Sequence, residues 1–302
     1  MTELPIGCQV AVIRLRSLGD CVLTTPALDI LKRARPDLRV AVVVEDRFRA
    51  VFEGNPDIET LLRPSWRELR AWSPEFCLNL HGASASARLT ALSGARTRAG
   101  FAHYRWQRLY NVRIPRAQQI LGEERTVHTA EHLASAMFYL GAPRVEIPRA
   151  KLFSGAPPGR PVLPPYAVIH PTASQPDKTW PATGFLAAAR FLRQSLDLDS
   201  VFIAGPGEDL AAFRAYRTVV GAPLGEIKSL LSGAALFLGN DSGPAHMAAA
   251  FGLPVVAIFG ASDPAIWHPW RTASVVIQNA AGIRSVTERQ VLDALERMRV
   301  HA

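Results

Sequence analysis

Four polar loops in the sequence carry residue types that could perform chemistry, and each follows a short run of apolar residues. The first is Ser17–Asp20, directly after Val10–Ile13. Its Gly19 permits a tight turn into a helix that begins near Asp20. A carboxylate at this position could accept the proton of a bound hydroxyl group as a general base. Asp is also a common helix N-cap, so spacing alone leaves both roles open for Asp20.

The second loop spans residues 170–181 and ends on Trp-Pro, where a helix is expected to begin. Hydroxyl groups, a lysine and a helix N-terminus together are typical of an anion site. We expect Lys178 to bind a phosphate, with the hydroxyl groups of Thr172 and Ser174 as further ligands. An ordinary connecting loop with a surface lysine would have the same sequence.

The third loop, Gly239–His246, contains a proline that suits the first position of a helix, preceded by Ser242 and Gly243 as the cap region. Backbone N–H groups at such a helix start can bind a phosphate. Asp241 would repel a phosphate, so we expect it to bind sugar hydroxyl groups at the edge of the site. His246 lies on the first helical turn. The alternative is a well-capped helix with a buried, hydrogen-bonded histidine.

The fourth loop follows Val201–Ala204 and contains Glu208. A carboxylate after a strand of a nucleotide-binding sheet often binds ribose hydroxyl groups. Glu208 could equally be a first-turn acid that complements a helix dipole. The pattern G-x-G-x-x-G does not occur in the sequence, which disfavours a dinucleotide-dependent hydride transfer.

The elements that must position these loops alternate between strands and helices. Short runs rich in Val, Ile and Leu predict buried parallel strands at 10–13, 40–44, 58–62, 76–80, 167–170, 201–204, 235–238, 255–259 and 275–277. Helices are expected between the first two strands, at about 130–140, and at 182–195, 207–219, 224–232, 244–251 and 286–299.

A linker divides this alternation into two blocks. Residues 148–165 contain six prolines and two glycines, a composition typical of an interdomain segment. We therefore predict an α/β protein with two Rossmann-like, doubly wound domains facing a cleft, 1–157 and 158–302, with the final helix, 286–299, free to pack back on the N-terminal domain. Ligands of such sheets bind at the carboxyl ends of the strands, where all four loops fall.

Composition excludes several classes of protein. The chain has 302 residues, 48% hydrophobic and 20% charged, which fits a globular protein rather than a disordered or fibrous one. The longest apolar stretch, 247–261, is interrupted by two glycines and a proline and is shorter than the roughly 20 residues of a membrane span. The N-terminus does not resemble a signal peptide. Three widely spaced cysteines suit a reducing cytoplasm and form no zinc pattern.

The positive charge is concentrated in the first half. Residues 1–157 contain 22 Lys and Arg against 15 Asp and Glu, whereas residues 158–302 contain 12 against 11. Seven arginines and no acid lie between Arg88 and Arg116. Such a patch suits nucleic acid, an anionic membrane surface or an acidic substrate, and it could also be a solvated surface without a partner.

Together these motifs resemble glycosyltransferase family 9, the ADP-heptose:lipopolysaccharide heptosyltransferases. The resemblance rests on residues 13–20 (IRLRSLGD), 25–28 (TPAL), 178–181 (KTWP), 238–246 (LGNDSGPAH) and 259–264 (FGASDP). It implies a GT-B fold, with the donor bound mainly by the C-terminal domain. It also implies an inverting, metal-independent transfer of heptose from ADP-heptose to a sugar of the lipopolysaccharide inner core, with no cofactor.

The resemblance also implies roles for matching residues. Asp20 corresponds to the proposed base, Lys178 to a ligand of the donor phosphate, and the stretch with Asp241, Ser242, Gly243 and His246 to the binding site for the donor sugar and diphosphate. Lysine and a helix N-terminus would then neutralise the leaving ADP. In the basic segment, Arg105, Arg108 and Arg113 are expected to bind an anionic lipid-linked or oligosaccharide acceptor, and the same charge would hold the enzyme transiently on the cytoplasmic face of the inner membrane.

Other functions remain open from the sequence. A GT-B transferase that uses another nucleotide sugar would share the fold and most motifs. A sugar-nucleotide-binding protein without turnover is disfavoured by the joint presence of Asp20, Lys178 and Asp241. Nucleic-acid binding is not expected, although Tyr104, Trp106 and Tyr110 lie between the arginines and could form a base-stacking surface.

Overall fold

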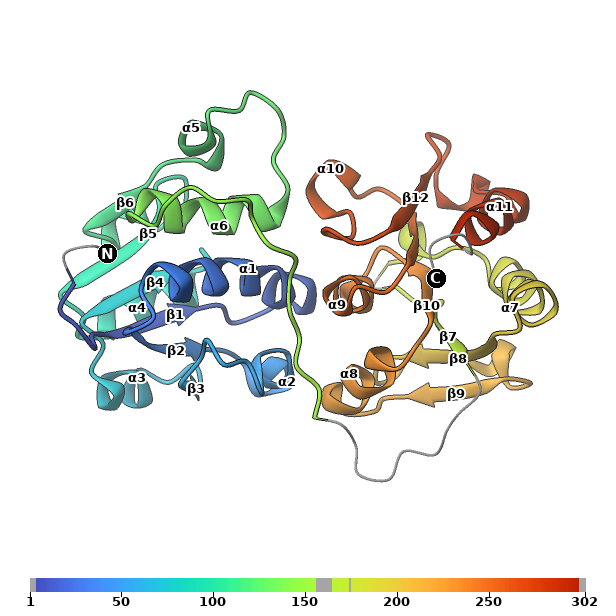
Figure 1. The fold of residues 1–302 in the computed structure, drawn as a ribbon, viewed down its shortest axis with the longest axis horizontal. Helices are drawn as coiled ribbons and strands as arrows, with labels where there is room; N and C mark the ends of the chain where they lie inside the picture. Colours follow the sequence, from blue (N-terminus) through green and yellow to red (C-terminus); the bar gives the residue numbers. More distant parts are fainter. Residues whose placement is uncertain (1–3, 156–164, 174, 299–302) are drawn as a thin grey trace. The chain divides into compact units, whose positions relative to one another are not determined.

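The computed structural model describes residues 4–155, 165–173 and 175–298. The chain divides into two compact units, Met1–Phe153 and Ser154–Ala302. Each unit has its own six-stranded parallel sheet with helices (Figure 1). Half of the predicted linker 148–165, namely 156–164, lies outside the described residues. None of the helices in the described part of the chain has the length and apolarity needed to cross a bilayer.

The first unit has the strand order β3-β2-β1-β4-β5-β6. Its strands are β1 (Gln9–Ile13), β2 (Arg39–Val43), β3 (Thr60–Leu62), β4 (Phe76–Asn79), β5 (Thr97–Phe101) and β6 (Val112–Ile114). The order reverses between β1 and β4, which is the switch point where doubly wound sheets bind ligands. The central register pairs Ile13 with Val43 on one side and with Asn79 on the other.

Helices cover both faces of this sheet, since right-handed crossovers on the two sides of the switch point lie on opposite faces. On one face α1 (Leu18–Ala34) and α6 (Thr129–Tyr139) lie side by side (Figure 1), with the short helices α2 (Arg49–Phe52) and α5 (Ala117–Leu121) nearby. On the other face Leu69 of α3 (Trp66–Trp72) and Leu89 of α4 (Ser84–Leu92) pack on Ala11 and Cys77 of the sheet.

The second unit repeats this plan with the order β12-β11-β10-β7-β8-β9. Its strands are β7 (Tyr166–His170), β8 (Asp199–Ala204), β9 (Arg217–Val220), β10 (Leu236–Asn240), β11 (Val255–Phe259) and β12 (Ser274–Gln278). Its helices are α7 (Ala182–Leu196), α8 (Leu224–Ser232), α9 (Gly243–Phe251), α10 (Pro264–Trp267) and α11 (Glu288–Met298). The two central strands, β7 and β10, are fully buried, as their continuous apolar sequences predict.

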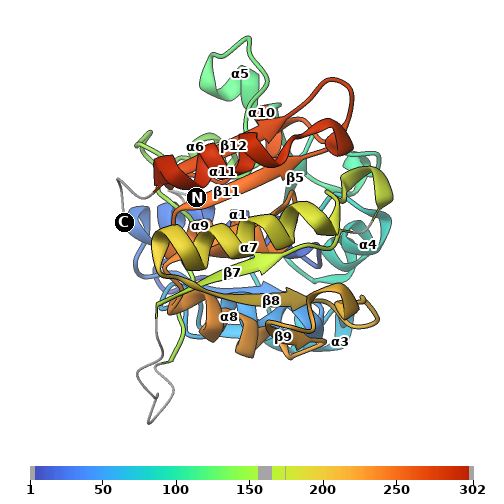
Figure 2. The same ribbon diagram turned by 90° about the vertical axis from the view of Figure 1, so that its right-hand side faces the viewer.

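The predicted final helix is α11, and its apolar face is used within the second unit. Val291, Leu295 and Met298 belong to the core that also contains Leu192 of α7. Figure 2 shows α11 beside α7 on the same side of the sheet. The helix therefore packs next to β11 and β12 within the second unit.

The prediction of a helix at 207–219 is wrong. This segment contains a 3₁₀ turn, Ala211–Phe213, followed by the edge strand β9. Its apolar residues recur at three-residue spacing, which the 3₁₀ turn satisfies by stacking Phe213 on Phe202 with ring centroids 4.3 Å apart. The β-branched run that follows extends the sheet. Strands β5 and β6 were not predicted, because their arginines and glycine mask the apolar pattern.

Candidate functional site

In the first unit, Asp20 lies just beyond the carboxyl end of β1, in the first turn of α1. The N-cap residue is Ser17, whose side chain makes no capping bond to the helix. Its hydroxyl instead donates to Asp20 Oδ2 at 2.9 Å, and the Arg14 guanidinium lies 3.5 Å from Oδ1. The Asp20 side chain keeps 24% exposure. The carboxylate is therefore held by neighbouring side chains and left accessible, and it is not the helix N-cap.

The charge of Arg14 also acts on two histidines of the first unit. Its side chain is only 6% exposed, and its charge acts on His81 and on His132 of α6. Burial and this charge lower the pKa of His81, and burial lowers the pKa of His132 to about 3, so both imidazoles are neutral at pH 7. The His81 Nδ1 atom is buried without a hydrogen-bond partner among the described residues. Arg14 and His81 had no role in the sequence prediction.

The predicted acceptor arginines, Arg105, Arg108 and Arg113, are all exposed. The Arg105 guanidinium lies 5.7 Å from the centre of the Trp106 ring. By contrast, Arg98 in the same basic segment donates to the carbonyl oxygens of Ala95 and Leu109. Arg98 therefore stabilises the local fold, whereas no hydrogen bond or ion pair to the rest of the described chain uses the three predicted guanidinium groups.

In the second unit, a chain of hydrogen bonds connects three of the four predicted loops. Thr172 Oγ1 lies 2.5 Å from Glu208 Oε2 and 3.1 Å from His170 Nε2, and His170 Nδ1 lies 3.0 Å from Ser242 Oγ. These residues follow β7, β8 and β10, which are neighbours in the sheet. The structure thus brings together Thr172, Glu208 and Ser242 as predicted, through His170, which the sequence placed in the loop without a role.

The chemistry of Glu208 sets the direction of every bond in this chain. A carboxylate only accepts, so the Thr172 hydroxyl donates to it, and the Thr172 oxygen then accepts from His170 Nε2–H. Burial lowers the pKa of His170 to about 4, so the ring is neutral and its Nδ1 accepts from the Ser242 hydroxyl. Glu208 Oε2 also accepts from Gly205 N–H at 2.7 Å. Both hydroxyl protons are therefore used internally, while Glu208 Oε1 and the Ser242 oxygen can still accept.

The structure shows whether Glu208 and Ser242 serve as the helix-terminal residues that the sequence also allowed. No helix begins at Glu208, so this residue is not a first-turn acid. Ser242 is the N-cap residue of α9, but its side chain does not cap the helix because its hydroxyl bonds to His170. Gly243 is the first residue of α9, and the neighbouring Asp241 is partly exposed. His246 is buried, with its ring 6.3 Å from that of Trp267.

Lys178 is the last residue of a 3₁₀ turn, Pro176–Lys178, and is partly exposed. Its ammonium group has no hydrogen-bond or ion-pair partner within the described ranges. The backbone of this turn lies against Gly260 at the end of β11, where a Cβ atom would come 2.3 Å from Asp177 O. Lys178 is therefore fixed at the same edge of the sheet as Ser242. Ser174 falls outside the described residues.

Asn240, another residue that the sequence prediction missed, holds the Lys178 loop at both ends. It lies fully buried at the end of β10, accepts from Trp180 N–H at 3.0 Å and donates to Pro171 O at 2.9 Å. Trp180 is anchored further by a bond from its indole N–H to Val286 O. The sequence does contain a signal for this role, an asparagine at the end of an apolar strand, since a buried amide must find hydrogen-bond partners.

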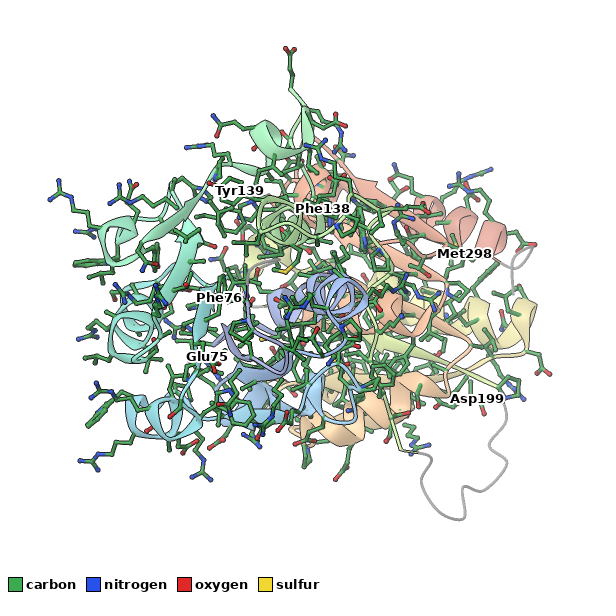
Figure 3. The ribbon with its side chains drawn as sticks, turned by 60° about the vertical axis from the view of Figure 1, so that its left-hand side comes forward. Glu75, Phe76, Phe138, Tyr139, Asp199 and Met298 are labelled. Atoms are coloured by element: carbon green, nitrogen blue, oxygen red, sulfur yellow. The ribbon has the colours of Figure 1, made fainter. Side chains whose placement is uncertain are left out.

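Two features bear on metal binding. Within 4–155, 165–173 and 175–298, no group of three or more His, Cys, Asp and Glu side chains is arranged to hold a metal ion. The chain contains one Asp-x-Asp sequence, Asp197-Leu-Asp199, but it lies at the amino end of β8, at the opposite edge of this sheet from the three loops of the second unit. Both carboxylates lie within 3.4 Å of Arg193, and Figure 3 labels Asp199.

Comparison with known proteins places this geometry in one family. Residues 62–295 match glycosyltransferase family 9 (heptosyltransferase). Lipopolysaccharide heptosyltransferase 3 of Escherichia coli is 27% identical, over 85% of this chain and 84% of the relative. Among solved structures, a family 9 glycosyltransferase from Veillonella parvula superposes with a TM-score of 0.85 at 22% identity, covering 98% of both chains. The E. coli heptosyltransferase WaaC with ADP superposes with a TM-score of 0.79 at 18% identity, covering 96% of this chain and 99% of that one.

The family match covers well over half of the chain, and the fold similarity extends over nearly all of it. The two doubly wound units with parallel sheets are those of the GT-B architecture expected from the sequence. This chain therefore belongs to glycosyltransferase family 9, the heptosyltransferases, and is a glycosyltransferase.

Proposed function

We propose that the protein transfers heptose from ADP-heptose to an inner-core sugar of lipopolysaccharide, with inversion at the anomeric carbon and without a metal ion. The observation that carries this proposal is the shared position of the donor-binding candidates. Thr172 follows β7, Glu208 follows β8 and Ser242 follows β10. The turn that carries Lys178 contacts Gly260 at the end of β11. These four strands are neighbours in the sheet, so the candidates share one edge. Such an edge is where doubly wound sheets bind nucleotides.

Asp20 acts in this proposal as the general base on the acceptor. The acceptor hydroxyl oxygen attacks the anomeric carbon as its proton passes to the Asp20 carboxylate. The bond from that carbon to the diphosphate oxygen breaks on the opposite face, so the configuration inverts and ADP leaves with the bonding electrons. The Ser17 hydroxyl and the Arg14 guanidinium support the base role because they orient the carboxylate without covering it.

The donor site uses its groups for different parts of ADP-heptose. Lys178 and the start of α9, which includes Gly243, neutralise charge on the leaving diphosphate. Because the hydroxyl protons of Thr172 and Ser242 are already donated, we assign neither as a donor to phosphate. Glu208 Oε1 and the Ser242 oxygen instead accept from hydroxyl groups of the ribose or the heptose, as does Asp241.

A donor screen tests this proposal directly. Purified protein is heated with ADP, UDP, GDP or ADP-heptose, and selective stabilisation by ADP and ADP-heptose is expected. The E. coli relative of known structure with ADP supports this choice of nucleotide. Preference for UDP or GDP would indicate a transferase for another nucleotide sugar, and binding without transfer to any acceptor would indicate a non-catalytic binding protein. Transfer should persist in EDTA, and full inhibition would contradict the metal-free mechanism.

We further propose that the acceptor is anionic, lipid-linked or an oligosaccharide, and that the reaction takes place at the cytoplasmic face of the inner membrane. The exposed arginines of the first unit support an anionic acceptor. Cys8, Cys21 and Cys77 are buried and free, which fits a reducing compartment.

Replacing Arg105, Arg108 and Arg113 together by Ala should raise the KM for an anionic acceptor and leave ADP affinity unchanged. Exposed charges attract a ligand through screened Coulomb forces, so the difference between the variants should shrink as ionic strength rises. The free energy of unfolding should stay within about 0.5 kcal/mol of the wild-type value, as for other surface changes. Arg98→Gln is the matched control, because loss of its two backbone bonds lowers stability instead. Unchanged acceptor kinetics in the triple variant would exclude this surface from acceptor binding.

The pKa of His170 predicts how stability depends on pH. Its value in the folded protein, about 4, lies below the 6.5 of an unperturbed histidine, so folding favours the neutral ring. The free energy of unfolding therefore keeps its full value above pH 6.5. It falls by about 3 kcal/mol in total as the pH drops from 6.5 to 4, because the unfolded chain binds a proton that the folded ring does not. Urea unfolding at pH 7 and pH 4 should therefore show a larger loss for wild type than for His170→Gln. Equal losses would show that His170 is not buried in its neutral form.

A further inference from the structure

One surface of the first unit combines exposed aromatic side chains with arginines. It is formed by the outer faces of α3 and α4 and by the segment around the 3₁₀ turn Gln107–Leu109, which packs against α4. We call it the aromatic–arginine face. Its exposed members are Trp66, Arg67, Arg70, Arg88, Leu92, Arg105, Trp106 and Arg108.

Three large apolar side chains on this face are left in solvent. Trp66 is 45% exposed, Leu92 52% and Trp106 43%. They lie on three neighbouring segments, with Trp66 at the start of α3, Leu92 at the end of α4 and Trp106 just before the 3₁₀ turn that contacts α4. Exposed apolar side chains that gather on one surface usually mark an interaction site, whereas scattered ones need no explanation.

The charge on this face has a single sign. The exposed residues of α3, α4 and the segment 105–108 include five arginines and no acid. The one acid of α3, Glu68, is only partly exposed and accepts from the backbone N–H of Arg63. Figure 3 shows nitrogen-tipped side chains projecting outward around this part of the first unit. The partner of such a face must be anionic and must also accept apolar side chains.

We propose that the aromatic–arginine face docks the enzyme on an anionic phospholipid bilayer. Tryptophan rings partition into the headgroup region, where their apolar body and N–H group are both satisfied, and guanidinium groups bind lipid phosphates. This proposal rests on the membrane-linked acceptor of the proposed function and assigns the surface that meets the membrane.

The placement of the guanidinium groups favours lipid over nucleic acid. Arg67 lies over the Trp66 ring, 5.4 Å from its centre, and Arg105 lies over the Trp106 ring. A nucleic-acid base needs the face of an aromatic ring for stacking, and these arginines cover one face of each ring. Leu92, which has no π-face, gains nothing from a base but can enter a bilayer surface.

The test measures cosedimentation of the full chain with vesicles of phosphatidylcholine alone or with about 30 mol% phosphatidylglycerol. Binding is expected only to the anionic vesicles and should weaken with added salt. The variant Arg67→Gln/Arg70→Gln/Arg88→Gln should bind about 100-fold more weakly, since each arginine near an anionic surface contributes about a factor of 5 to 6. Trp66→Ala/Trp106→Ala should also lose affinity for the same vesicles.

The matched control is Arg190→Gln/Arg214→Gln/Arg217→Gln, which removes the same charge from exposed positions of the second unit. Its vesicle binding should remain close to wild type, and an equal loss in both triple variants would overturn the assigned face. Vesicle binding that is unaffected by the tryptophan changes, or equal affinity of wild type for a short DNA duplex, would overturn it as well. All variants should melt as wild type does.

Stabilisation by ADP separates this proposal from the proposed function. If wild type is stabilised by ADP but does not bind anionic vesicles, the docking face is wrong and the donor assignment stands. If it binds the vesicles through this face but is not stabilised by ADP or ADP-heptose, the docking face stands and the proposed function fails.

Discussion

Asp20→Asn should abolish heptose transfer while ADP affinity stays near that of wild type. The amide has nearly the shape of the carboxylate but cannot accept the proton of the acceptor hydroxyl. Loss of a general base lowers the rate by about 10² to 10⁴. The donor candidates lie in the second unit, so they keep their contacts. The measurement is transfer from ADP-heptose under saturating donor, together with the shift in melting temperature caused by ADP.

Two other residues of the first unit provide the controls for this result. Asp46→Asn removes an exposed carboxylate of the same unit and should leave transfer unchanged. Ser17→Ala removes the hydroxyl that orients Asp20 and should cause a smaller loss, since the base itself remains. Turnover of Asp20→Asn at the wild-type rate would show that the carboxylate only stabilises its surroundings.

Lys178→Ala should weaken the binding of ADP and ADP-heptose by about 10- to 100-fold and slow the transfer. A charge-assisted hydrogen bond to phosphate is worth about 1.5–3 kcal/mol. The ammonium group has no partner in the described parts of the chain that would compete with the phosphate. Calorimetric titration with ADP measures the loss, and Lys178→Arg should recover part of it because the charge is kept. Unchanged ADP affinity in Lys178→Ala would remove this residue from the site.

The sequence predicted the parts of the fold that follow simple periodicity. The central strands of both sheets are continuous apolar runs, and the four loops after them contain the donor candidates and Asp20. The sequence did not predict β9, because three-residue spacing fits both a helix and a 3₁₀ turn. Nor could it reveal His170 as the link between loops, since that role depends on distances between residues far apart in the chain.

The direction of the hydrogen bonds among the donor candidates was also beyond sequence reasoning. A threonine, a serine and a lysine in a polar loop all look like phosphate ligands. Only the contact between Thr172 and Glu208 shows that the hydroxyl proton is already committed. Residue type predicts what a side chain can donate, but the partner decides whether the proton is available.

The two bonds of Asn240 have a consequence for the thermodynamics of the proposed donor binding. Because this amide holds Pro171 at one end of the loop and Trp180 at the other, the loop that carries Lys178 closes when the second unit folds and not when the nucleotide arrives. Nucleotide binding then orders few additional residues, and a preorganised loop retains more of its interaction energy as affinity. In Asn240→Ala the loop would become ordered only when ADP binds. The entropy of ADP binding would then be more unfavourable, although the substitution changes no proposed ADP contact.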